Sequence, residues 1–356
     1  MMALMERLPE SVDLSIYTSA PEWLFRQNLA RPFRFVSVDL DVGTVQRDCF
    51  HPDADATLSA FAALWESRHA RVVELADDLR EHGVSGALID IAPLAMEACF
   101  VANVPAVAIS NFTWDWIYEP FVASRPHYRR LLDEIRAAHG RVEALFRLPL
   151  HGEMRGFRRI VPVGHLFRPP RASRQATRDR LHFDPARVHV LISFGGLGEK
   201  RLPFDAMSKM GGYQFHLLQD MDEPTPPNLS VYPNGTVYHP DLVQACDVVL
   251  GKLGYGLVAE CLSSRRPIVY VPRTGFAEHD VFVAELPARL PILPLSEEDF
   301  LSGRWLEALE AILRAPLPPP GADLDGARDI LGKLGSAPIF AAQTLVTGGT
   351  CRENRR

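Results

Sequence analysis

The chain alternates short apolar runs with longer segments of helical periodicity, and this alternation constrains its fold more than any other feature. Parallel strands need long crossover connections, which helices usually supply. The apolar runs that we expect to form strands are Leu14 to Tyr17, Phe35 to Val38, Ala87 to Asp90, Ala106 to Ser110, Val188 to Phe194, Phe215 to Leu218, Asp247 to Leu250 and Ile268 to Val271. The pattern therefore predicts an α/β protein with parallel sheets covered by helices.

The length of the chain predicts two domains. With 356 residues it exceeds the size that one hydrophobic core usually serves. The stretch from Ile160 to Pro170 carries prolines and basic residues with little helical periodicity, so we expect it to connect the domains. We place the first domain at residues 1–168, the second at 169–316, and a proline linker with a helical tail at 317–356. The sequence leaves open which domain the tail packs against.

The composition is that of a globular protein without a membrane-spanning segment. Apolar residues make up 47% and charged residues 23%, and no apolar run approaches the roughly 18 residues that a span requires. The net charge of −6 argues against a nucleic-acid partner. Five cysteines without a C-x-x-C pair, and no signal-peptide pattern, favour a cytoplasmic protein without disulfides or a bound metal.

A glycine-rich turn follows the expected strand Asp247 to Leu250 and leads into a helical pattern. Gly251, Gly254 and Gly256 allow backbone conformations and close approaches that a side chain would block. The first amides of the following helix have no internal partners and favour an anion such as a phosphate or diphosphate. Lys252 could neutralise a departing diphosphate. The alternatives are a tight turn that binds nothing and a Lys252 that hydrogen-bonds a neighbouring carbonyl.

Polar or glycine residues also follow other expected strands. In open α/β sheets ligands bind beyond the carboxyl ends of the strands, so we expect a site in the crevice between the two sheets. The candidate positions at these strand ends are Asp90, Asn111, the pair Gly195 and Gly196, and the segment from Lys252 to Gly256.

Three segments carry a resemblance to a known family. The stretch from His239 to Pro272 is similar to the donor-binding core of two-domain (GT-B) glycosyltransferases. Asn111 to Tyr118 and Leu250 to Gly256 resemble the glycosyltransferase-like module of plant arabinokinases and its free-standing bacterial relatives. The resemblance spans about residues 12–310. It implies two Rossmann-like domains facing across a cleft, the first for the acceptor and the second for a nucleotide sugar. No galactokinase-like domain follows, so sugar kinase activity is not implied.

The resemblance also implies a nucleotide-sugar site in the second domain. The carboxylate of Glu260 would hold the ribose hydroxyls, since a carboxylate accepts two hydrogen bonds; the alternative is a solvated helix residue. Polar residues at the donor sugar would be Glu278, His279 and Asp280, unless they form a surface loop. The remaining residues of this implied site are Gly195, Gly196, Lys252, Gly254, Tyr255 and Gly256.

On the acceptor side we expect Asn111, Trp114 and Trp116 to form a platform for a sugar ring or a hydrophobic acceptor. Asp115 and Asp90 are the candidate catalytic residues. The alternatives are that the tryptophans close the core of the first domain and that each aspartate caps a helix.

Families of this type open with a buried strand and a loop rich in Gly and His, and this sequence shows neither. We therefore expect the first domain to lack its first strand and transfer to be weak or absent. The function that follows is a glycosyltransferase that moves a hexosyl or related sugar from a nucleotide sugar, a UDP-sugar, to an unknown acceptor without a cofactor or metal. The rival interpretations are a noncatalytic nucleotide-sugar sensor and a nucleotide-sugar epimerase.

Overall fold

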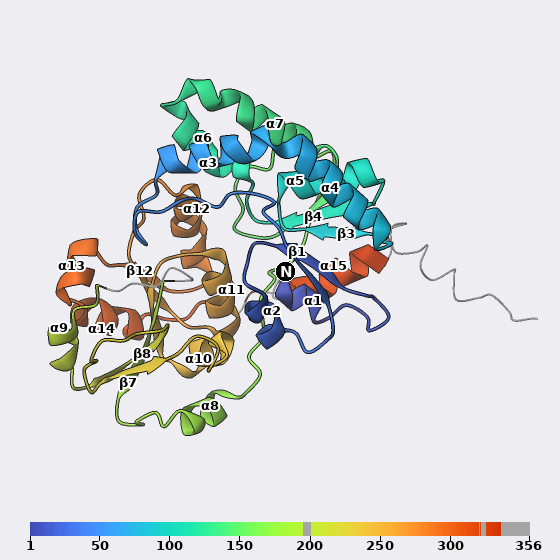
Figure 1. Cartoon of the computed structure of the whole chain (residues 1–356). Helices are drawn as coiled ribbons and strands as arrows, with labels where there is room; N and C mark the ends of the chain where they lie inside the picture. The colour runs from blue at the N-terminus through green and yellow to red at the C-terminus, as the bar shows by residue number, and fades with distance from the viewer. Residues whose placement is uncertain (195–200, 320, 322–324, 336–356) are drawn as a thin grey trace, which may run out of the picture.

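The protein forms two α/β domains, each built on its own parallel sheet (Figure 1). The structure is a computed structural model, which describes residues 1–194, 201–319, 321 and 325–335. The predicted phosphate-loop residues Gly195 and Gly196 lie outside the described residues.

The first domain contains a parallel four-stranded sheet with the order β3-β4-β5-β6 and a separate parallel pair, β1-β2. The six strands are β1 (Ser15–Thr18), β2 (Arg34–Ser37), β3 (Ala87–Ile89), β4 (Ala106–Ser110), β5 (Ala144–Arg147) and β6 (Ile160–Pro162). Among the described residues, no strand joins β1 to β3, so both are edge strands. This division is what we expected of a first domain without its first strand.

Helices cover both faces of the four-stranded sheet because the apolar side chains of its strands alternate in direction. In β4, Ala108 faces the core beneath α3 to α7, whereas Val107 and Ile109 face the opposite side. The helices of this part of the chain are α1 (Met2–Met5), α2 (Glu22–Asn28), α3 (Ala54–Glu66), α4 (Arg68–Glu81), α5 (Pro93–Ala102), α6 (Trp114–Ala123), the 3₁₀ helix η1 (Pro126–Tyr128) and α7 (Arg129–His139).

The second domain is built on a six-stranded parallel sheet with the order β12-β11-β10-β7-β8-β9. Its strands are β7 (Val188–Ser193), β8 (Tyr213–Leu218), β9 (Leu229–Tyr232), β10 (Val248–Gly251), β11 (Ile268–Tyr270) and β12 (Ile292–Pro294). Every residue of β10 is buried, as expected for a central strand covered on both faces. The reversal of strand order between β10 and β8 lies at β7, where the sheet offers a binding crevice.

Helices also cover both faces of this sheet, since Val190 and Ile192 pack on one side and Leu191 on the other. They are α8 (Arg174–Arg180), α9 (Phe204–Ser208), α10 (His239–Ala245), α11 (Tyr255–Ser264), α12 (Ala277–Glu285), the 3₁₀ helix η3 (Leu286–Ala288), α13 (Glu297–Ser302) and α14 (Leu306–Arg314).

The C-terminal helix α15 (Gly326–Gly335) returns to the first domain and covers the second face of its sheet (Figure 1). Ala327, Ile330 and Leu334 pack there against the apolar side chains of β4 and β5. Gly326 permits this close approach, because a Cβ at that position would lie 2.1 Å from the carbonyl oxygen of Gly164. The sequence left open which domain the C-terminal tail packs against, and α15 packs against the first domain.

All eight strands expected from the sequence are present, with bounds that differ by one or two residues. The structure adds β5, β6, β9 and β12. The segment from Ile160 to Pro170 was therefore only partly a connector, because its first three residues pair with β5.

Within the described residues, no helix combines the length and apolar character that crossing a bilayer requires. Cys99, Cys246 and Cys261 are buried thiols, as expected of core residues.

Candidate functional site

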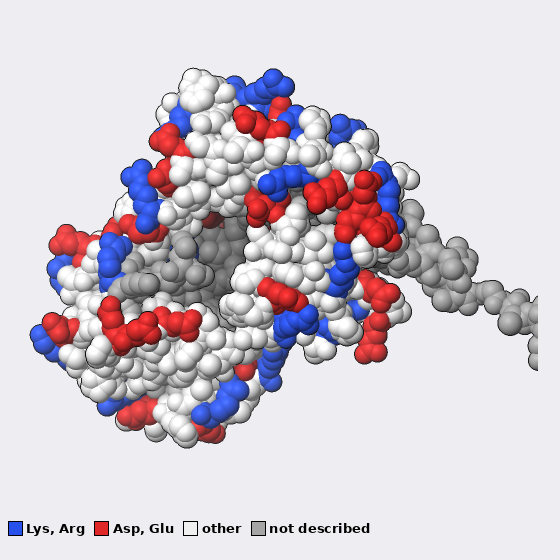
Figure 2. All heavy atoms as spheres, in the orientation of Figure 1, with Lys and Arg blue, Asp and Glu red and all other residues white. Residues whose placement is uncertain are grey.

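A pocket of about 240 Å³ lies between the two domains. Figure 2 shows the surface hollowed there. Asp90 and Asn111, which follow β3 and β4, line it from the first domain, and Tyr255 and Gly256, which begin α11, line it from the second. Of the strand-end positions expected at the crevice, the structure brings Asp90, Asn111, Tyr255 and Gly256 together here, whereas Lys252 and Gly254 do not line the pocket. The rings of Phe112 and Tyr255 stack across it with centroids 5.7 Å apart.

The turn between β10 and α11 has the geometry expected of an anion site. Gly251 is required by packing, because a Cβ there would lie 1.9 Å from the carbonyl oxygen of Ser193 in β7. Gly254 is the N-cap of α11, with an extended backbone and no side-chain capping hydrogen bond. The first amides of α11 therefore keep their hydrogen-bonding capacity, and the helix dipole favours a negative charge beside them.

Lys252 stands in this turn without a partner. It is half-buried, and its amino group makes no hydrogen bond or ion pair with any residue that the structure describes. Burial and the nearby charge of Arg273 lower the pKa of Lys252 to about 8. The alternative that Lys252 hydrogen-bonds a neighbouring carbonyl is therefore wrong in this structure.

Glu260, the implied ribose ligand, lies on the buried face of α11 and is 5% exposed. One carboxylate oxygen accepts hydrogen bonds from Arg168, at 2.8 and 3.2 Å, and the other lies 2.6 Å from Nδ1 of His239. Burial raises the pKa of Glu260, but the charges and hydrogen bonds of His239 and Arg168 outweigh it and hold this pKa below its ordinary value.

The expectation of a solvated helix residue is therefore wrong for Glu260. Arg168 and His239 occupy three of the roughly four hydrogen bonds that a carboxylate can accept, so Glu260 keeps capacity for at most one ribose hydroxyl while both partners stay in place. Arg168 also donates to Asn28 at the end of α2, at 3.0 Å. Glu260 thus anchors a contact that links the second domain to α2.

The three residues proposed for the donor sugar begin α12 rather than a surface loop. Glu278 is mostly buried, 3.8 Å from Arg273, and burial raises the pKa of Glu278. His279 lies beside Tyr270 with ring centroids 5.6 Å apart, and Asp280 is exposed. Only Glu278 and His279 therefore lie against the end of β11.

The acceptor-side residues divide into two groups. Asn111 lines the pocket and donates to the carbonyl of Pro149 at 2.8 Å. Neither Trp114 nor Trp116 lines it. Trp114 stacks on Tyr118 inside the first domain, and Trp116 packs against the backbone of Gly152. The alternative that the tryptophans close the core of the first domain describes this packing better than an acceptor platform does.

Asp115 does not reach the pocket. It is 1% exposed and pairs with Arg136 of α7 at 2.7 Å. A carboxylate that is buried against an arginine inside one domain cannot contact an acceptor in the cleft, so the structure contradicts the expectation of a catalytic Asp115.

Asp90 does lie in the pocket, directly after β3, and it is exposed to solvent there. Partial desolvation by the surrounding protein raises the pKa of its carboxyl group. Asp41, which the sequence analysis missed, lies near it. Burial and the negative charge of Asp90 raise the pKa of Asp41 to about 6, against the hydrogen bond that Trp114 donates at 2.9 Å. Raised carboxylate pKa values in a cleft are typical of groups that exchange protons.

Comparison with known proteins identifies the fold. No protein-family model matches the chain. L-arabinokinase from Arabidopsis thaliana is 30% identical over 308 residues, which make up 84% of this chain but 29% of that protein. The chain thus spans less than a third of the length of this curated relative.

Among solved structures, the glycotransferase of kitacinnamycin superposes with a TM-score of 0.60 at 15% identity, covering 97% of this chain and 93% of its own. UGT89C1 of Arabidopsis thaliana, solved with UDP, gives 0.59 at 13% identity and covers 94% and 95%. A UDP-glucosyltransferase from Polygonum tinctorium gives 0.60 at 13% identity with the same coverage. The chain therefore has the GT-B fold of glycosyltransferases, and it resembles in sequence a part of plant L-arabinokinase.

Proposed function

We propose that the chain transfers a hexosyl or related sugar from a UDP-sugar to an acceptor that binds in the pocket between the domains. The observation that carries this proposal is the start of α11, which has no side-chain cap and whose Tyr255 and Gly256 line the same pocket as Asp90. Lys252 lies in the turn before this helix and forms no hydrogen bond or ion pair with a described residue. The structures of similar fold support the choice of nucleotide, because UGT89C1 has been solved with UDP and, separately, with quercetin.

In the proposed reaction an acceptor hydroxyl attacks the anomeric carbon of the donor while the bond from that carbon to the diphosphate oxygen breaks. Asp90 accepts the proton of the hydroxyl, for which its raised pKa suits it. The departing UDP gains negative charge, which Lys252 and the first amides of α11 stabilise. We propose that the reaction needs no metal ion, because these groups supply the positive charge.

A thermal shift experiment tests the nucleotide site. A ligand that binds only the folded state increases the free energy of unfolding, by about 2.7 kcal/mol at a concentration of 100 Kd, and so raises the melting temperature. We expect UDP to raise the melting temperature of the purified protein and Lys252→Gln to reduce that shift. If saturating UDP, GDP and dTDP all leave the transition of the wild type unmoved, the proposal is wrong.

A further inference from the structure

A second cation, Arg273, lies next to Lys252 at the edge of the second sheet. Lys252 follows β10 and Arg273 follows β11, and these strands are parallel neighbours with Gly251 opposite Tyr270. Because both strands end at the same edge, their following residues meet there. The sequence analysis did not single out Arg273.

Arg273 is 6% exposed, yet its guanidinium is incompletely paired. Nη2 donates to the side-chain oxygen of Gln46 at 3.2 Å, and Nη1 lies 3.8 Å from a carboxylate oxygen of Glu278, which is too long for a hydrogen bond. Nε is buried and has no partner among the described residues. The face of the guanidinium stacks on the ring of Phe276, 3.2 Å from its centroid. Phe276 and Gln46 thus fix the position of the Arg273 side chain, while its Nε still has a hydrogen bond to donate.

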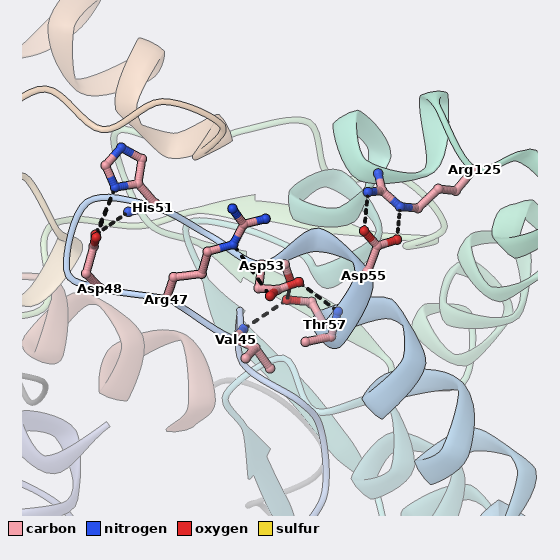
Figure 3. Close-up of polar contacts among 9 residues, drawn as sticks. Val45, Arg47, Asp48, His51, Asp53, Asp55, Thr57 and Arg125 are labelled. Atoms are coloured by element: carbon pink, nitrogen blue, oxygen red, sulfur yellow. Dashed lines mark hydrogen bonds and ion pairs between the residues drawn. The ribbon is translucent and has the colours of Figure 1, made fainter.

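A segment of the first domain, residues 43–53, contacts Arg273 through Gln46. Its Phe50 is 1% exposed and packs on Phe194 and Phe300 of the second domain. The hydrogen bond that this segment forms with Arg273 comes from the neutral side chain of Gln46. The carboxylate of Asp48 points instead to His51, as Figure 3 shows.

The charges around Arg273 do not balance. Two cations, Lys252 and Arg273, face one carboxylate, Glu278, whose second oxygen is buried without a partner among the described residues. Burial lowers the pKa of Arg273 to about 10, and burial together with Arg273 lowers that of Lys252 to about 8. A buried and a half-buried cation that lie close together, with one carboxylate between them, form a place where a dianion is stabilised.

Backbone groups add to this preference. The nine-residue helix α12 starts beside Arg273 without a side-chain cap, as does α11 beside Lys252. We propose that Arg273 joins Lys252 in binding the distal phosphate of a nucleoside diphosphate, and that Arg273 makes the site prefer diphosphates to monophosphates. This inference rests on the proposed function, and it adds Arg273 to the residues that would bind the diphosphate.

Titration calorimetry with UDP and UMP tests the inference. For the wild type we expect tighter binding of UDP than of UMP. Arg273→Gln should weaken UDP binding by about 10- to 100-fold, the range for a hydrogen bond to a charged group, and leave UMP binding within about twofold. Arg314→Gln on α14 removes an exposed arginine that pairs only with the exposed Glu310 and should change neither affinity.

Equal losses for UDP and UMP, or no loss, in a folded Arg273→Gln variant would overturn the inference. Glu278→Gln gives an independent test if that variant does not fold. It removes the partly neutralising carboxylate, so UDP binding should tighten while UMP binding stays the same, and unchanged or weaker UDP binding would contradict the inference. A wild type that binds neither nucleotide refutes the proposed function itself, whereas a wild-type preference for UDP that survives in Arg273→Gln refutes only the role of Arg273.

Discussion

The substitution Glu260→Ala probes the buried contact that joins α11 to His239 and to Arg168. It removes a carboxylate that both side chains contact, and it leaves Arg168 and His239 without this partner. Breaking a fully buried ion pair by removing one partner costs about 3–5 kcal/mol. The side chains of Arg168 and His239 are 24% and 22% exposed, so water can recover part of their hydrogen bonding. We therefore expect Glu260→Ala to lower the free energy of unfolding by about 2–4 kcal/mol.

Urea denaturation followed by circular dichroism measures this loss. The control is Glu310→Ala, which removes an exposed carboxylate paired with Arg314 within α14 and should cost about 0.5 kcal/mol or less. The difference between wild type and Glu260→Ala should depend on pH. Because the folded-state pKa of Glu260 is lowered, its contribution is present above the unfolded-state pKa of about 4.3 and is lost as the pH falls through the folded-state value. A loss below about 1 kcal/mol at pH 7 would refute the reasoning that the buried contacts of Glu260 with these two side chains stabilise the fold.

Three further predictions follow from particular residues. Asp90→Asn should reduce sugar transfer by about 100-fold or more while UDP binding, measured by calorimetry, stays unchanged; equal transfer would assign the proton to another group. Burial and the charges of His189 and Arg178 lower the pKa of His216 to about 3. The free energy of unfolding should therefore decrease as the pH falls below about 6.5, by up to ~1.4 kcal/mol per pH unit. His216→Phe should flatten that dependence in urea titrations at several pH values. Hydrogen exchange should be faster in the edge strands β1 and β3 than in the central strand β7, and equal protection would show that the two-stranded pair is as stable as the second domain.

Much of the fold could be predicted because its central strands are continuous apolar runs. β4 and β10 are buried along their whole length, so the sequence marks them clearly. The strands that were missed include β6 and β12, which have three residues each, lie at sheet edges and end in proline. Such segments look like connectors, because edge strands tolerate proline and exposure.

The candidate site could be predicted only where it lies on one continuous motif. The turn from Gly251 to Gly256 was found by its spacing. The partners of Glu260 could not be predicted, because Arg168 lies 92 residues away along the chain and nothing in a single sequence indicates that pairing. Asp41 was missed for a related reason, since it follows no strand-like run and reaches the cleft through tertiary packing with Trp114.

The central claim is that the chain transfers sugar from a UDP-sugar, and release of UDP tests it most directly. The protein would be incubated with a panel of UDP-sugars and a mixture of phenolic and sugar acceptors, and free UDP and glycosylated products would be measured by mass spectrometry. We expect UDP release with at least one donor, matched by a glycosylated acceptor and abolished in Asp90→Asn. Binding of UDP-sugars without release of UDP from any donor would contradict the claim and would favour a noncatalytic nucleotide-sugar sensor.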